Sequence, residues 1–144
     1  MLLIGYPVLR TYGRHASFFL EQDMQVIVDA ERFGDTVIVT LKERMDVFNA
    51  PLLMKEFNQL LDEGAVHFIV DLTAVRIVDA DGDYPLLHLL KRAQEAGGDV
   101  TLVCPPGNPI RVFYEMMRLD TLFDMVETLD AALAEIELSA ENEV

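Results

Sequence analysis

The chain has 144 residues, of which 51% are hydrophobic, and a formal net charge of −14. This composition fits one globular domain with its own core and excludes an intrinsically disordered chain, which would be poor in hydrophobic residues. No hydrophobic run reaches the roughly 18 residues of a membrane span. The acidic balance argues against nucleic acid as a partner, because phosphate binding needs clustered Lys and Arg.

Residues 1–23 differ from the rest of the chain, because a regular strand pattern begins only at Met24. They lack the basic start of a signal peptide, and the hydrophobic patch at residues 17–20 is short. We interpret residues 1–23 as an N-terminal extension, either a mobile arm or an upstream misreading. The single cysteine, Cys104, excludes an internal disulfide and is interpreted as a buried strand-end residue. Together these features predict a cytoplasmic protein.

A β-hairpin is predicted at the start of the domain. Hydrophobic residues recur in 24–33, a turn signal is present at 34–36, and residues 37–45 alternate as the returning strand.

A helix with both ends marked is predicted at residues 49–64. Asn49 is the predicted N-cap, Pro51 is tolerated in the first turn, and Gly64 can take the left-handed conformation that ends a helix. Four residues fall on one hydrophobic stripe: Leu53, Phe57, Leu60 and Leu61.

A near-continuous hydrophobic run at residues 65–72 predicts a central strand covered on both faces. His67 lies in this strand and is interpreted as a structural residue. Residues 73–78 are expected to be a short connection to an acidic loop. A second helix is then expected to begin near Tyr84 and to end at Gly97-Gly98. Its predicted buried residues are Leu86, Leu87, Leu90 and Ala93.

The last third of the chain continues the alternation. Residues 99–104 predict a strand and residues 110–119 a third helix; a short strand and a final short helix at 129–136 are expected after them. The inward side of the third helix is predicted to carry Ile110, Phe113, Met116 and Met117.

This order predicts an α/β fold, a mixed four- to five-stranded sheet with helices packed on it. We expect one domain at residues 24–137 and an acidic tail at 138–144.

The acidic loop Asp79-Ala80-Asp81-Gly82-Asp83 is the main candidate site, because neighbouring carboxylates raise the cost of ionising one another. It does not match a calcium loop, since Gly82 comes too early and Leu90 holds the position of the bidentate Glu. A second reading is a cap, in which Asp81 or Asp83 caps the helix beginning near Tyr84.

A third reading is catalytic. "IVDADGD" is similar to the first motif of haloacid-dehalogenase phosphatases, with Asp79 as nucleophile and Asp81 as general acid beside magnesium. The strand at 99–104 supplies no acid at its end, so the full catalytic set is missing.

The order of motifs over roughly residues 24–136 resembles a STAS domain, the fold of anti-sigma factor antagonists. "FIVDLTAVRIVDADG" at residues 68–82 resembles a strand ending in D-L and the D-S-S-G signature after it. "MDVFNAPLL" at residues 45–53 is similar to the family segment L-D-x-x-x-A-P-x-L. "LDTLF" at residues 119–123 resembles the closing phrase, with Arg118 in place of its glycine.

The resemblance implies a non-enzymatic module of a partner-switching system, with no cofactor, no metal and no catalytic residue. The loop Asp79-Ala80-Asp81-Gly82-Asp83 would bind the partner, a serine-kinase-like anti-sigma factor or another STAS protein. Asp81 holds the position that we take as the phosphoacceptor, and neither it nor Ala80 can be phosphorylated by a serine kinase. The loop would thus resemble a phosphorylated one permanently. A weak homodimer is also expected.

Overall fold

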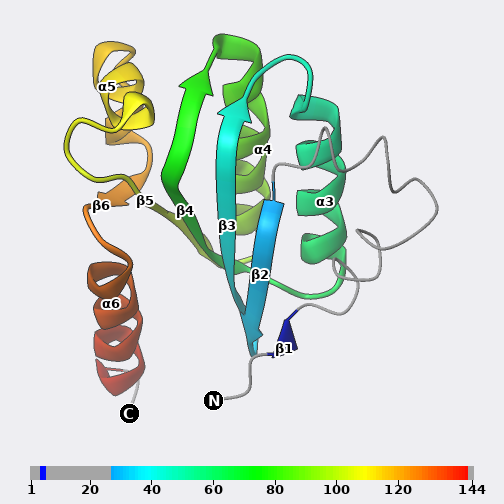
Figure 1. Ribbon diagram of the computed structural model, residues 1–144. Helices are drawn as coiled ribbons and strands as arrows, with labels where there is room; N and C mark the ends of the chain where they lie inside the picture. Colours follow the sequence, from blue (N-terminus) through cyan, green and yellow to red (C-terminus); the bar gives the residue numbers. More distant parts are fainter. Residues whose placement is uncertain (1–3, 6–26, 143–144) are drawn as a thin grey trace.

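A computed structural model describes residues 4–5 and 27–142; of residues 4–5 and 137–142 it describes the backbone alone. Its centre is a six-stranded sheet in the order β1-β2-β3-β4-β5-β6 (Figure 1). β1, β2 and β3 pair antiparallel, and β3 to β6 pair parallel. The strands are β1 (Ile4–Gly5), β2 (Ile27–Phe33), β3 (Thr36–Met45), β4 (His67–Val78), β5 (Asp99–Val103) and β6 (Asp124–Val126).

Helices lie on both faces of this sheet. α3 and α4 cover one face, α6 packs on the other, and α5 lies at the end where β3 and β4 finish (Figure 1). The predicted α/β fold with a mixed sheet is therefore confirmed, and the two-residue β1 adds one strand at the edge. The helices are α3 (Ala50–Asp62), α4 (Ala80–Glu95), α5 (Pro109–Met116), the 3-10 turn η1 (Leu119–Thr121) and α6 (Leu129–Asn142).

The larger core lies between the sheet and α3 and α4. Phe57 of α3 meets Phe68 of β4 edge to face, with ring centroids 6.5 Å apart. The hydrophobic stripes predicted for α3 and α4 point into this core, with Leu61 and Leu87 only partly buried at its margin. Its fully buried members include Val37, Val39, Leu41, Leu53, Phe57, Leu60, Phe68, Val70, Leu72, Leu86, Leu89, Ala93 and Leu102.

A smaller core beneath α6 explains why β4 reads as a continuous hydrophobic run. Ile38, Ile69, Val103 and Ala132 are buried there, on the face opposite α3 and α4. β4 is thus covered on both faces, as predicted.

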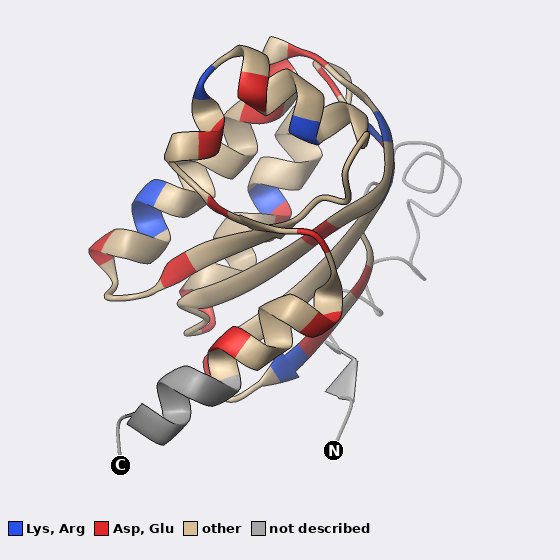
Figure 2. Cartoon of the chain, turned by 90° about the vertical axis from the view of Figure 1, so that its left-hand side faces the viewer, with Lys and Arg blue, Asp and Glu red and all other residues tan. Residues whose placement is uncertain are grey.

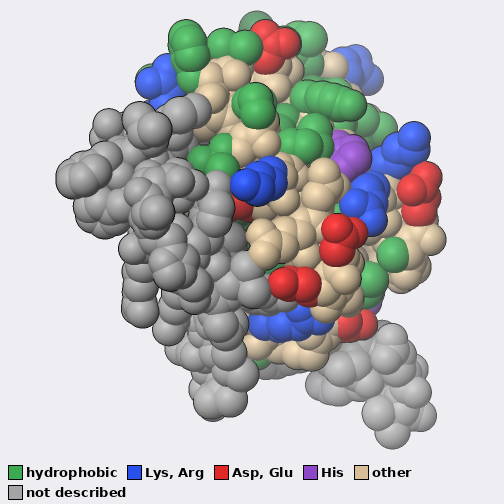
Figure 3. All heavy atoms as spheres, turned by 90° about the vertical axis from the view of Figure 1, so that its right-hand side faces the viewer, with side chains coloured by type: hydrophobic (Ala, Val, Ile, Leu, Met, Phe, Trp, Pro, Cys, Tyr) green, Lys and Arg blue, Asp and Glu red, His purple; other side chains and the backbone are tan. Residues whose placement is uncertain are grey.

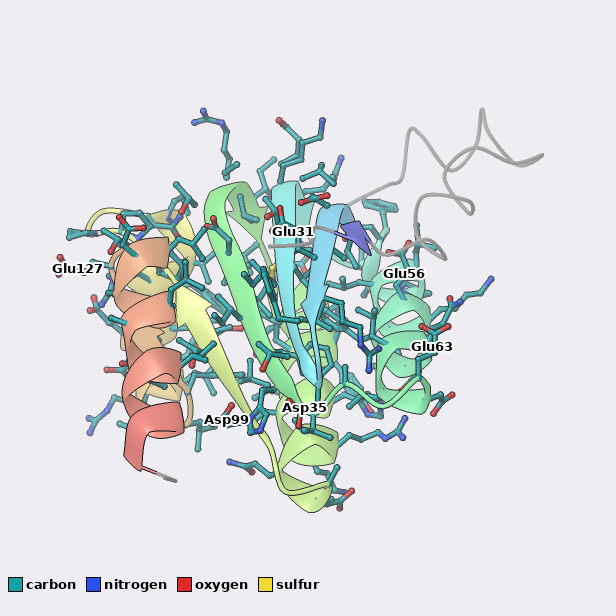
Figure 4. All side chains as sticks on the ribbon, turned by 90° about the horizontal axis from the view of Figure 1, so that it is seen from below. Glu31, Asp35, Glu56, Glu63, Asp99 and Glu127 are labelled. Atoms are coloured by element: carbon teal, nitrogen blue, oxygen red, sulfur yellow. The ribbon has the colours of Figure 1, made fainter. Side chains whose placement is uncertain are left out.

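His67 begins β4 at the end of the sheet remote from the acidic loop, and it does not lie in the core. Its Nδ1 is 3.1 Å from Asp99 Oδ1 and its Nε2 is 4.0 Å from Asp35 Oδ2. Both aspartates lie at that end of the sheet (Figure 4). The interpretation of His67 as a sheet residue with partners holds.

The short connection expected at residues 73–78 is wrong. β4 runs without a break through these residues and pairs with β3 as far as Met45↔Val78. Two register shifts in this pairing, and a φ of 67° at Glu43, let the strands continue with an irregular pattern that hides the alternation.

The inward placement of Met116 and Met117 is also wrong. α5 has only 8 residues and ends at Met116, and its buried side is formed by Ile110 and Tyr114. Met116 is 75% exposed and Met117 is exposed as well. Met116 lies two residues after Tyr114 and therefore on the opposite side of the helix, and Met117 follows the last helical residue.

The remaining differences concern the ends of elements. Met24 to Val26, expected in the first strand, lie outside the described residues. α6, expected to be short, continues to Asn142. Among the described residues, no helix is long and hydrophobic enough to cross a membrane.

Candidate functional site

The acidic loop forms the start of α4, at the end of the sheet where β3 and β4 finish (Figure 1). Asp79 has an extended backbone and is the N-cap: its Oδ1 accepts a hydrogen bond from the Gly82 N–H at 2.8 Å. The prediction that Asp81 or Asp83 caps a helix beginning near Tyr84 is wrong, since α4 begins at Ala80. Asp81 and Asp83 lie in its first turn, where a negative charge faces the positive end of the helix dipole.

Gly82 holds α4 against the end of β3. A Cβ built on Gly82 would lie 1.8 Å from the carbonyl oxygen of Met45, closer than two such atoms can approach. The Asp79 N–H also donates to this carbonyl, at 3.2 Å. The glycine of the D-A-D-G motif is therefore needed for close packing of the helix start against the strand.

Asp83 does not belong to the exposed part of the loop. It is only 4% exposed and accepts a hydrogen bond from the hydroxyl of Tyr114, which is fully buried in α5. Burial raises the pKa of Asp83, and the Tyr114 hydroxyl opposes this shift. Burial, and then the Asp83 charge, raise the pKa of Tyr114 well above its usual value.

The three aspartates thus have three different roles in the structure. Asp79 caps the helix, Asp83 ties α4 to α5, and within the loop only Ala80 and Asp81 are exposed. The electrostatic cost of placing three carboxylates together is reduced, because their side chains point to different surroundings.

The turn between β3 and α3 lies beside this loop and was missed as part of the site. The Asp46 carboxylate accepts hydrogen bonds from the N–H groups of Phe48 at 3.0 Å and Asn49 at 3.4 Å, and it also binds Arg44. A hydrogen bond joins this turn to the acidic loop: the Val47 N–H donates to Asp79 Oδ2 at 3.4 Å. The segment "MDVFNAP" contained the signal, since Asp and Asn in a short polar turn bond to nearby backbone.

Asn49 occupies the N-cap position of α3, as predicted, but its side chain makes no capping hydrogen bond. Its side chain points back into the turn, where Oδ1 accepts from the Asp46 N–H at 3.0 Å and Nδ2 donates to the Arg44 carbonyl at 2.8 Å. An N-cap side chain would bind the second or third N–H of the helix, and the second helical residue, Pro51, has none.

Exposed hydrophobic side chains lie at the same end of the molecule as Asp81. Figure 3 shows such side chains gathered at the end of the molecule where β3 and β4 finish. The turn contributes Val47 and Phe48, β4 contributes Ile77, and α4 contributes Tyr84. Acidic residues are spread over several helices and loops and are not confined to one segment (Figure 2).

The catalytic reading of the loop gains no support. Both carboxylate oxygens of Asp79, the nucleophile in that reading, accept backbone hydrogen bonds. Within residues 27–136, no group of three or more His, Cys, Asp or Glu side chains is arranged to hold a metal ion. Cys104 is buried, and burial raises the pKa of its thiol to about 12, which keeps it protonated at neutral pH.

Comparison with known proteins places these features in a family. The family model of the STAS domain matches residues 28–132. A candidate anti-sigma factor antagonist from Thermotoga maritima is 25% identical, covers 75% of this chain and 92% of its own, and superposes with a TM-score of 0.68. No curated protein matches the chain.

Two further structures share the fold at lower identity. An anti-sigma factor antagonist from Mycobacterium paratuberculosis is 21% identical over 75% of this chain and 91% of its own, with a TM-score of 0.65. The anti-sigma factor antagonist SpoIIAA, in its unphosphorylated form, is 16% identical over 75% of this chain and 96% of its own, with a TM-score of 0.60.

Proposed function

The chain belongs to the STAS domain family, and from this membership we propose that it is a non-enzymatic interaction module of a partner-switching system. Its partner would be a serine-kinase-like anti-sigma factor or another STAS protein. The binding surface would include the exposed part of the Asp79–Asp83 loop and the neighbouring turn with Val47 and Phe48.

The observation that carries this proposal is the exposure of Asp81. The resemblance to D-S-S-G assigns the phosphoacceptor to this position, and Asp81 lies in the first turn of α4 with its side chain open to solvent. A phosphate there would add nearly two negative charges beside the helix N-terminus. Asp81 supplies one charge at the same place and cannot be removed by a phosphatase, so we expect the chain to bind its partner without a phosphorylation switch.

The solved relatives support a protein partner in general. SpoIIAA, which shares the fold, has been solved in unphosphorylated and phosphorylated forms. At 16% and 15% identity, these two structures support only the fold of this chain. The identity of its partner is a proposal that the binding assays test. We further propose that it acts in the cytoplasm, which cell fractionation would test.

Direct binding and kinase assays test the proposal. Each serine-kinase-type anti-sigma factor of the source organism would be purified and titrated with wild type, Asp81→Ser and Asp81→Asn. We expect wild type to bind one of them with and without ATP and to incorporate no phosphate in the loop. Asp81→Ser should become phosphorylated with ATP and then lose affinity, because the phosphate carries nearly two negative charges where Asp81 carries one. Asp81→Asn, which has neither charge nor hydroxyl, should bind regardless of ATP.

Two results would contradict the proposal. Phosphate on any loop residue of the wild-type chain would show that the loop is switchable. Failure of wild type to bind any of these anti-sigma factors or a STAS protein of the same organism would remove the partner-switching role. Hydrolysis of p-nitrophenyl phosphate with magnesium, lost in Asp79→Asn, would instead revive the phosphatase alternative.

A further inference from the structure

Phe48 is an exposed aromatic side chain in the turn between β3 and α3. It is 69% exposed, and its neighbour Val47 is exposed too. A large hydrophobic side chain in such a position does not contribute to stability as it would in the core, because its burial there is favourable. The pair lies beside the acidic loop that contains Asp81, since the Val47 N–H donates to Asp79 at the start of α4.

The backbone beneath Phe48 is held by two buried polar side chains. Asp46 and Asn49 are each 3% exposed, and each accepts a backbone N–H of the other. Asp46 also accepts the N–H of Phe48 itself, at 3.0 Å, and Asn49 donates to the Arg44 carbonyl at 2.8 Å. Burying such groups is unfavourable unless they are bonded, and here their bonds serve to fix the turn that presents Phe48.

The Arg44 side chain supports the Phe48 ring. The guanidinium carbon of Arg44 lies 5.6 Å from the ring centroid, in a cation–π contact, and Arg44 is itself paired with Asp46. The ring is therefore oriented while most of its surface stays free. A side chain that is already ordered loses little conformational entropy when it enters a partner's pocket.

We propose that Phe48, together with Val47, is the anchor that determines which partner this chain binds, and that Asp46 and Asn49 are its positioning residues. This inference rests on the proposed function and specifies the partner of the same surface. The partner would be a folded protein with an apolar pocket that receives Phe48. Because Asp81 is exposed in the loop that Asp79 joins to the turn, the rim of that pocket would carry a basic side chain.

Alanine substitution of Phe48 is the first test, with Met116 as the matched control. Both side chains are largely exposed, so neither substitution should unfold the protein, and Met116 lacks the buried polar frame of Phe48. Affinity would be measured by calorimetry with the anti-sigma factor or STAS protein that wild type binds. We expect Phe48→Ala to weaken binding by about 30-fold, as for a hot-spot residue, and Met116→Ala to stay within about twofold.

A double-mutant cycle separates positioning from stability. Asn49→Ala should weaken binding about fivefold in the wild-type background, on the scale of coupling energies measured between neighbouring residues. It should leave the affinity unchanged in the Phe48→Ala background, because there is then no ring to position. An equal loss in both backgrounds would overturn the positioning role, and circular dichroism at the assay temperature would verify that each variant is folded.

The outcomes distinguish this inference from the proposed function. If wild type binds a partner and Phe48→Ala binds it equally well, the anchor is wrong and the proposed function stands. If wild type binds none of these proteins, both the proposed function and the role of Phe48 as an anchor are wrong. If sedimentation shows a wild-type dimer that Phe48→Ala abolishes, a second copy occupies Phe48, which also overturns the assignment to another protein.

Discussion

Tyr114→Phe removes a single hydroxyl group from the contact between α5 and α4. The Tyr114 hydroxyl is the donor to Asp83, and both side chains are buried. The substitution keeps the ring and leaves the Asp83 carboxylate without this donor. A hydrogen bond to a charged group contributes about 1.5–3 kcal/mol, so we expect a loss of about 2–3 kcal/mol in the free energy of unfolding at pH 8.

This loss should depend on pH. Burial raises the pKa of Asp83 above 3.8 in the folded state, so the folded chain binds its proton more tightly than the unfolded chain. The Asp83 contribution to stability is then fully present below the unfolded pKa and is lost as pH rises through the folded pKa. Because the hydroxyl opposes the shift, Tyr114→Phe should raise the folded pKa further. Each additional unit corresponds to about 1.4 kcal/mol lost at high pH.

Urea denaturation monitored by circular dichroism at several values from below pH 4 to pH 8 measures the effect, because the pKa of Asp83 is raised from 3.8. The difference between wild type and Tyr114→Phe should grow with pH across this range. Tyr84→Phe is the matched control, because Tyr84 lies in α4 with its side chain 55% exposed, and it should have little effect at any pH. Asp83→Asn should abolish the pH dependence of the difference. An equal loss below pH 4 and at pH 8 would refute the reasoning.

Three further predictions concern other parts of the chain. Gly82→Ala places a Cβ 1.8 Å from the Met45 carbonyl oxygen and should cost more than about 3 kcal/mol in chemical denaturation. Arg118→Gly relieves a φ of 62° and should raise stability by about 0.5–1 kcal/mol; a lower melting temperature would contradict this. The pKa of Glu135 is raised to about 7, first by a hydrogen bond to Asp124, so its contribution is present below pH 4.5 and lost through pH 7. Glu135→Gln should therefore have a higher melting temperature than wild type at pH 8 but not at pH 5. The gain in free energy of unfolding should be less than about 1 kcal/mol, because the group is largely exposed.

The family and most elements could be predicted because they depend on local patterns. The position that the closing phrase of the family reserves for glycine has a left-handed φ in the structure, although Arg118 occupies it. The alternation in β3 and the stripe of α3 are confirmed, and Gly64 ends α3 with a φ of 100°. The same pattern did not predict the second half of β4, because register shifts in its pairing with β3 interrupt the alternation of period two.

The roles of the candidate residues could not be read in the same way. Asn49 stands at the N-cap of α3 as expected, but its side chain bonds to the preceding turn and not to the helix, because its bonding partners lie before it in the chain. Met116 follows Ile110 and Phe113 at a spacing of three, yet the buried side of α5 is formed by Ile110 and Tyr114, which leaves Met116 exposed. Both differences arise because a residue type permits several bonds or surroundings, and the neighbouring elements select among them.

The acidic loop shows which properties the sequence determines and which depend on the tertiary structure. The sequence by itself determined that three carboxylates and a glycine come after a strand, in an order similar to the STAS signature, with no hydroxyl at Ala80 or Asp81. Only the tertiary structure decided that Asp79 is a cap, that Asp81 is exposed and that Asp83 is buried. The physical reason is that burial and hydrogen bonding depend on groups distant in the chain: Tyr114, the partner of Asp83, lies 31 residues away.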